Sequence, residues 1–141
     1  METSRFLLLL SLLLMAGPVA SISTNISIDN SQVQATGATY TFNMSIQNSV
    51  SSVGKLIVRF PSDFETPFTN LKCQAKLNFA TNGNIACSYD STVRMLTITD
   101  GFPLKARFFE FSVTGISNPT SSGTSGLYSV GTYVRQNNAW L

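Results

Sequence analysis

Few residues in this chain could do chemistry, and the most telling absence is histidine. None of the 141 residues is a histidine, so the usual general base for activating a serine or cysteine nucleophile is missing. Paired carboxylates could still hydrolyse a glycosidic bond, and Asp63 with Glu65 is the single close pair. We interpret that pair as a solvated or weakly calcium-binding edge, because same-side carboxylates on a short loop are more often of that kind. Four of the six acids after residue 21 stand in predicted turns or loops, where aspartate serves turn geometry. We therefore expect no enzymatic activity, no catalytic residue and no cofactor.

The two cysteines, Cys73 and Cys87, favour a disulfide. An even count supports pairing in an exported chain, where the environment is oxidising. Closing a loop of about 15 residues stabilises a fold by roughly 3 kcal/mol in the chain-entropy model. Two buried free thiols and a metal site are the alternatives. Zinc takes four ligands, usually Cys or His, and the chain has two cysteines and no histidine. We therefore expect no metal.

Two asparagines match the acceptor pattern for N-linked glycans. Asn25 is followed by Ile and Ser, and Asn43 is followed by Met and Ser. Chance matches are frequent in a chain with 34 Ser and Thr residues, but both asparagines fall on the polar phase of predicted strands. A glycan at either position would leave the core undisturbed, so we predict both as glycosylation sites.

Aromatic residues gather in the last third of the chain. Aromatics exposed on a sheet can stack on sugar rings or anchor a protein partner, which makes them candidates for ligand stacking. Packing in the core or at the terminus is the plainer alternative. The candidates are Phe102, Phe108, Tyr128, Tyr133 and Trp140.

Residues 1–21 have the three-part plan of a secretory signal peptide. A short head with Arg5 precedes an apolar run over residues 6–15, and small residues follow. Cleavage after Ser21 leaves small residues at the two positions that require them, whereas cleavage one residue earlier would put Pro18 at one of them. The apolar run is short for a membrane span of about 20 residues, so a signal anchor is the weaker alternative. We expect a secreted or cell-surface protein with no further membrane span.

Beyond the signal the dominant sequence period is two, which is typical of half-buried strands. The clearest case is residues 38–46, where Tyr40, Phe42 and Met44 alternate with Thr and Asn. The expected strands are residues 25–29, 38–46, 55–60, 71–79, 84–89, 93–99, 107–114 and 127–135.

The Asn-Gly pair at residues 82–83 is a hairpin signal. It predicts that residues 71–79 and 84–89 are paired strands, with Cys73 and Cys87 near facing positions. About eight short strands and no amphipathic helix favour one all-β domain over residues 22–141, an antiparallel immunoglobulin-like β-sandwich with Greek-key connections. Trp140 and Leu141 form an apolar end, so either the last strand runs to the terminus or the chain is part of a longer protein; we favour the second.

Charge is sparse, with 11% charged residues and a net charge of +2. Such a mild excess predicts neither nucleic-acid binding nor a polybasic membrane patch. Solubility must then come from hydroxyls, amides or attached sugar.

Two stretches carry a resemblance to known modules. Residues 109–119, Phe-Glu-Phe-Ser-Val-Thr-Gly-Ile-Ser-Asn-Pro, and the Leu-Tyr-Ser-Val of residues 127–130 resemble the closing strand-loop-strand of immunoglobulin-like β-sandwich modules in extracellular surface proteins. Residues 54–61, Gly-Lys-Leu-Ile-Val-Arg-Phe-Pro, are similar to modules of large surface proteins of ciliated protists. The chain lacks the Cys-to-Trp-to-Cys arrangement of antibody-type domains.

The resemblance implies a structural or adhesive surface module and brings no catalytic residues with it. We expect a protein or glycan partner at the cell surface. The alternative function is a carbohydrate-binding module that uses the carboxy-terminal aromatics.

Overall fold

The computed structural model describes residues 22–47, 50, 52–64, 68–102, 107–121 and 126–133, together with the backbone of residues 135–136 and 139–140. The predicted signal peptide lies outside the described residues, as does Glu65 of the acidic pair.

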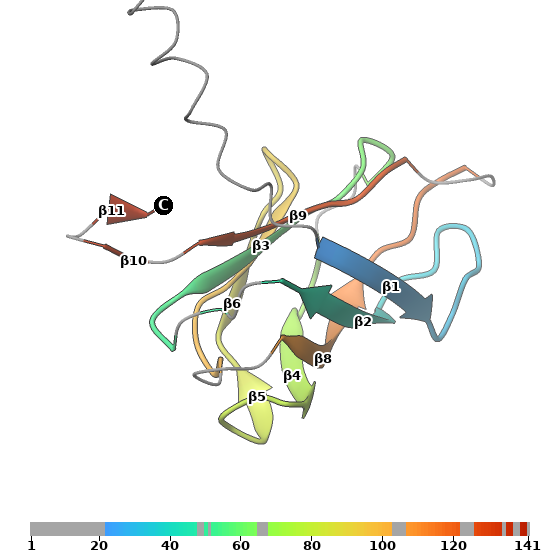
Figure 1. Ribbon diagram of the computed structural model, residues 1–141. Coiled ribbons are helices and arrows are strands. Elements are labelled where there is room, and N and C mark those ends of the chain that lie inside the picture. The colour runs from blue at the N-terminus through green and yellow to red at the C-terminus, as the bar shows by residue number, and fades with distance from the viewer. Residues whose placement is uncertain are drawn as a thin grey trace, which may run out of the picture.

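Two antiparallel sheets face each other (Figure 1). The five-stranded sheet has the order β1 (Ile22–Ile28), β2 (Ala38–Ile46), β8 (Phe108–Ile116), β4 (Lys72–Leu77) and β5 (Gly83–Ile85). The four-stranded sheet has the order β6 (Cys87–Asp90), β7 (Met95–Ile98), β3 (Lys55–Arg59) and β9 (Ser129–Tyr133). A short pair, β10 (Arg135–Gln136) with β11 (Ala139–Trp140), follows near the end of the chain. The prediction of an all-β antiparallel sandwich is confirmed.

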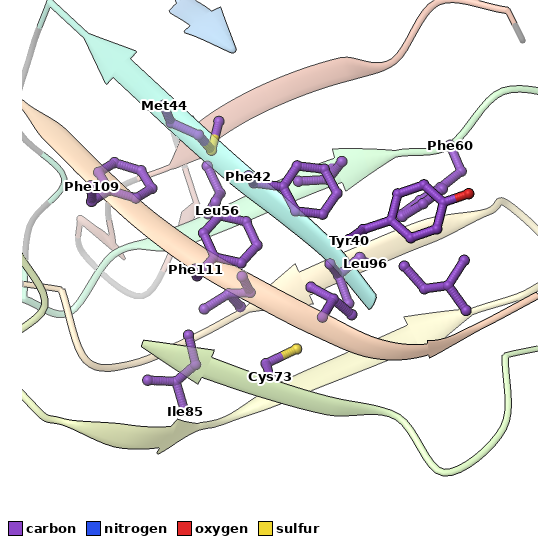
Figure 2. Packing of buried hydrophobic residues seen from close by; sticks show 14 of the residues in the cluster. Tyr40, Phe42, Met44, Leu56, Phe60, Cys73, Ile85, Leu96, Phe109 and Phe111 are labelled. Atoms are coloured by element: carbon purple, nitrogen blue, oxygen red, sulfur yellow. The ribbon is translucent and has the colours of Figure 1, made fainter. Parts of the chain in front are cut away.

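Alternation in β2 places every second side chain in the core. Tyr40, Phe42 and Met44 are at most 1% exposed, while the intervening residues are half-buried. Phe42 lies opposite Phe111 of β8, and their rings stack at a centroid distance of 5.0 Å. Figure 2 shows the inward side chains of β2 in a row from Met44 through Phe42 to Tyr40. Burial of such large apolar side chains is what holds the two sheets together, at about 1.5–3 kcal/mol for each residue.

The predicted strand over residues 84–89 is wrong, because the chain changes sheets in the middle of it. β5 pairs with β4 in the five-stranded sheet, whereas β6 belongs to the four-stranded sheet. Ala86 is the residue between them; its amide donates to the Asp100 carboxylate at 2.9 Å, and its carbonyl accepts from the Thr99 amide at 3.2 Å. The turn after β7 therefore holds the crossing, and the hairpin partner of Cys73 is Ile85 rather than Cys87.

A bulge near the end of β8 resets which side chains face the core. Thr39 of β2 pairs with Thr114, but its neighbour Ala38 pairs with Ile116, so Gly115 is the extra residue. In a strand without the bulge, Gly115 and Ser117 would face the core as Val113 does. The bulge instead turns Ile116 and Asn118 inward, which is how bulges re-aim side chains.

Only glycine fits at this bulge. Gly115 has a φ of 98°, and a Cβ there would collide with the backbone carbonyl oxygen of Thr69. Gly37 also has a positive φ, 74°, but a Cβ there would meet nothing within 4 Å.

The pair gives a matched test of the bulge. Gly37→Ala should lower the free energy of unfolding by about 1–2 kcal/mol through backbone strain alone. Gly115→Ala should lower it by at least about 2 kcal/mol more, because the added methyl group meets immobile backbone. Urea unfolding of both variants measures the difference, and equal losses would contradict a sterically closed bulge.

Candidate functional site

The disulfide predicted from the sequence is present and joins the two sheets. Cys73 lies on β4 and Cys87 on β6, with their Cα atoms 6.1 Å apart. The Cys73 side chain faces the core, as Figure 2 shows. The bond therefore links the sheets at the point where the chain crosses between them. No other cysteine occurs in the sequence.

The two glycan acceptors lie directly opposite each other on neighbouring strands. Asn25 of β1 and Asn43 of β2 are register partners, which puts their Cβ atoms about 4.5–5.5 Å apart. Asn25 is exposed on the edge strand, whereas Asn43 is half-buried, with Glu110 of β8 opposite it on the other side. Glycosylation at either residue stays a prediction.

The five candidate stacking aromatics do not form one surface. Phe102 is 2% exposed and packs in the core between Phe79 and Phe109. Phe108, 43% exposed, stands outward on the five-stranded sheet, whereas Tyr133 stands on the four-stranded sheet with the Lys55 ammonium 5.2 Å from its ring centroid. The side chain of Trp140 lies outside the described residues. Phe102 is thus a core residue, and the two exposed rings are on opposite faces of the sandwich.

Tyr128, the fifth candidate, belongs instead to a cavity at one end of the sandwich. The cavity measures about 260 Å³ and opens between the loop that follows β1 and the segment that follows β8. Both segments lie on the same side of the molecule in Figure 1. Its apolar wall is made by Ile28, Val33, Phe64, Pro119 and Tyr128, and its polar lining includes Tyr40, Asp63 and Asn118.

A buried hydrogen-bond network forms the floor of this cavity. The Tyr40 hydroxyl donates to Asn118 Oδ1 at 2.7 Å. Both hydrogens of Asn118 Nδ2 are also used, since that nitrogen donates to the carbonyls of Asn30 and Gln32, each at 2.7 Å. A buried polar group without a partner costs about 1–3 kcal/mol. The hydrogen bond between Tyr40 and Asn118 avoids that cost for both side chains.

Backbone hydrogen bonds make the same connection between the two segments. The Asn118 amide donates to the Ala35 carbonyl at 2.9 Å, and the Gln34 amide donates to the Pro119 carbonyl at 3.0 Å. Gln34 adopts a positive φ of 61° in this turn. The β1–β2 loop is therefore held in place by the residues after β8, and the cavity wall is preformed.

Asp63 contributes the cavity's distinctive charge. Its Oδ1 atom is buried and has no hydrogen-bond partner among the described residues. Burial raises the pKa of Tyr40 to about 12, and the carboxylates of Asp63 and Asp29 add to that shift. Two negative charges thus act on the same phenol, and none of the described residues that line the cavity is Lys or Arg.

Three other aspartates are occupied by turns, as the sequence predicts. Asp29 accepts from the Thr39 amide at 2.8 Å, and that bond lowers the pKa of the Asp29 carboxyl. Asp90 accepts from the Thr92 amide and Asp100 from the Ala86 amide, both at 2.9 Å. In the described part of the chain, no three acidic, Cys or His side chains gather where they could hold a metal ion.

Sequence reasoning missed Tyr40, Asp63 and Asn118 as a site. Tyr40 carried a signal, because a tyrosine on the inward phase of a strand needs a partner for its hydroxyl. No sequence signal indicated that this partner would be Asn118, which lies 78 residues later.

Among the described residues, no helix has the length and apolarity that a membrane span needs.

Comparison with known proteins adds little to this geometry. No family model matches the chain, and no curated protein matches it. One solved structure, described as the crystal structure of the RrgA Jo.In complex, is similar over 79% of this chain and 68% of that one. The identity is 12% and the TM-score 0.45, and both values are too low to bear on the function of the site.

The buried phenol of Tyr40 should be visible in an alkaline titration. Its folded-state pKa of about 12 lies above the ordinary value of 10.0, so the stabilisation is fully present below pH 10 and is lost as the pH rises from 10 to 12. Absorbance at 295 nm should show late ionisation near pH 12, with its amplitude reduced by one tyrosine in Tyr40→Phe. Tyr133→Phe is the control and should keep that late phase; an unchanged late phase in Tyr40→Phe would contradict the assignment.

Proposed function

We propose that this chain is exported through residues 1–21 and acts outside the cytosol or at the cell surface as a structural or adhesive β-sandwich module without catalytic activity. The observation that carries the proposal is the disulfide between Cys73 and Cys87. Disulfides persist in oxidising compartments and are rare in the cytosol. The likeness to immunoglobulin-like surface modules belongs to the same proposal.

The energetic role of the disulfide supports an extracellular setting. The bond closes a loop with a sequence separation of 14, which is worth roughly 3 kcal/mol in the chain-entropy model. A domain of this size has about 5–15 kcal/mol of stability in total. Reduction would therefore remove a large share of the stability, and it would free the two sheets from their covalent link.

The placement of the carboxylates supports a module without chemistry of its own. Asp29, Asp90 and Asp100 each accept a backbone hydrogen bond in a turn. Glu110 lies on the outer face of the five-stranded sheet, opposite Asn43. The three aspartates are therefore engaged in local structure.

The outer face of the five-stranded sheet suits one glycan rather than two. A sugar on Asn25 projects from an edge strand, where one side is open. Asn43 has neighbours on both sides and shares its space with Asn25. We propose Asn25 as the residue that carries a glycan in the folded protein.

The carbohydrate-binding alternative has less support from the geometry. It relied on a platform of carboxy-terminal aromatics, but Phe102 is buried and the rings of Phe108 and Tyr133 lie on opposite faces. An adhesive role through the end cavity does not need that platform.

Expression of the full chain in a eukaryotic secretory host tests the proposal. The secreted protein should begin at Ile22, contain no titratable thiol, and lose the mass of one glycan on treatment with an N-glycosidase. The glycan should disappear in Asn25→Gln and remain in Asn43→Gln, because only Asn25 has open space around it.

A chain lacking residues 1–21 is the control for export, and it should stay in the cytosol with both thiols reduced. Retention of the full chain in the cytosol with free thiols would overturn the proposed location. A glycan lost in Asn43→Gln but kept in Asn25→Gln would overturn the glycan assignment alone.

A further inference from the structure

The inner surface of the end cavity offers hydrogen-bond acceptors and no spare donors among its three central polar side chains. Tyr40 gives its hydrogen to Asn118, which leaves lone pairs on the Tyr40 oxygen. Asn118 spends both amide hydrogens on backbone carbonyls. Asp63 lines the cavity with a half-buried side chain, and no described residue donates to its buried Oδ1 atom. Ser31, Gln32 and Ser121 also line the cavity and can donate or accept, but a ligand that contacts the three central side chains must itself bring donors.

The charge of the cavity specifies which donor fits. The Asp63 and Asp29 carboxylates both act on the Tyr40 phenol, and the described lining residues supply no cation. Asp63 is half-buried, and a cation that pairs with a partly desolvated carboxylate is favoured over a neutral group. The rings of Phe64 and Tyr128 also line the cavity, and aromatic faces attract cations.

The volume limits the size of the ligand. A cavity of about 260 Å³ falls below the roughly 300–1,000 Å³ of sites for drug-sized molecules. It suits one long side chain better than an oligosaccharide. The apolar wall of Ile28, Val33 and Pro119 would cover an alkyl stem, as happens where Lys buries its methylene groups against apolar surface.

Ammonium matches the acceptors better than guanidinium does. An ammonium group is a compact charge with three freely directed donors, whereas guanidinium is a planar fork that favours two carboxylate oxygens side by side. Asp63 Oδ1 is buried, so the Asp63 carboxylate cannot offer both of its oxygens side by side to a ligand in the cavity, and the Tyr40 oxygen is a single acceptor on a different residue. We propose that this cavity binds the side chain of a lysine presented by a protein partner, with the ammonium group held by Asp63 and Tyr40.

This inference rests on the proposed adhesive role, for which it names a contact. Because the Asn118 network already holds the cavity wall, little ordering should be needed on binding, and preorganisation favours affinity. A single buried side chain gives a weak contact, so the affinity expected for an isolated lysine is millimolar.

A nuclear magnetic resonance titration of the full secreted chain tests the inference. The probe is Nα-acetyl-lysine methylamide, and the comparison ligand is Nα-acetyl-norleucine methylamide, which has a similar stem without the ammonium group. The lysine probe should cause saturable shifts in the amide signals of Gln32, Phe64 and Asn118. The norleucine probe should bind at least about tenfold more weakly.

Variants separate the charge of Asp63 from the general charge of the domain. Asp63→Asn should weaken lysine binding at least about tenfold, whereas Glu110→Gln removes one negative charge from the outer face of the five-stranded sheet and should leave binding unchanged. Tyr40→Phe removes the second acceptor and should weaken binding as well. The ligand comparison needs no variant, so the inference stays testable even where a variant folds poorly.

Three results would overturn the inference: equal binding of the norleucine and lysine probes, unchanged binding by Asp63→Asn, or shifts of the same amides by a neutral methyl glycoside that Asp63→Asn leaves intact. The last result would assign the cavity to a sugar. Each of these outcomes leaves export, the disulfide and the glycan untouched, so failure of this inference is distinguishable from failure of the proposed function.

Discussion

The hydrogen bond from the buried Tyr40 hydroxyl to Asn118 is the constraint on which the end of this sandwich depends. Tyr40 lies near one end of the row of inward side chains on β2, where its side chain is 1% exposed and its hydroxyl needs a partner within the protein. Asn118, two residues after the end of β8, accepts the hydrogen of that hydroxyl. The bulge at Gly115 turns Asn118 inward. The side-chain amide of Asn118 then holds the β1–β2 loop. The hydrogen bond of one buried phenol hydroxyl thereby shapes the end cavity.

The disulfide imposes a second, separate constraint, at the crossing between β5 and β6. Ala86 carries the chain from one sheet to the other, Asp100 caps its amide, and Cys73 with Cys87 links the sheets on either side of it. Cys73 and Cys87 line a second cavity together with Leu71, Lys72 and Ile85, and neither Tyr40 nor Asn118 is among its described lining residues. The fold thus has a covalent link at the crossing and a hydrogen-bonded network at the end cavity.

Sequence patterns predicted most of the strands because strand periodicity is local. Residues 38–46 are a strand with the predicted bounds and the predicted inward face. The division of residues 84–89 between two sheets could not be predicted, because the alternation of polar and apolar residues runs through Ala86 without a Gly or Pro to mark the crossing. The inward phase of Phe109, Phe111 and Val113 was predicted, but the bulge after it depends on the backbone of Thr69, which is distant in sequence.

The candidate site was less predictable than the fold for the same reason. Cys73 and Cys87 could be paired by count, since the chain has only two. The grouping of Tyr40, Asp63 and Asn118 depends on three segments that are distant in the sequence and meet in the folded chain. The aromatic candidates failed as a group because one-dimensional clustering says nothing about which face of which sheet a ring occupies, as Phe108 and Tyr133 demonstrate.

A double-mutant cycle between Tyr40 and Asn118 tests the central claim most directly. The free energy of unfolding would be measured for Tyr40→Phe, Asn118→Ala and the double variant. If the two side chains satisfy each other, the losses should be non-additive, with a coupling energy of about 1–3 kcal/mol. Losses that add to within about 0.5 kcal/mol would show that the hydrogen bond does not organise the end of the sandwich, and the account of the preformed cavity would be wrong.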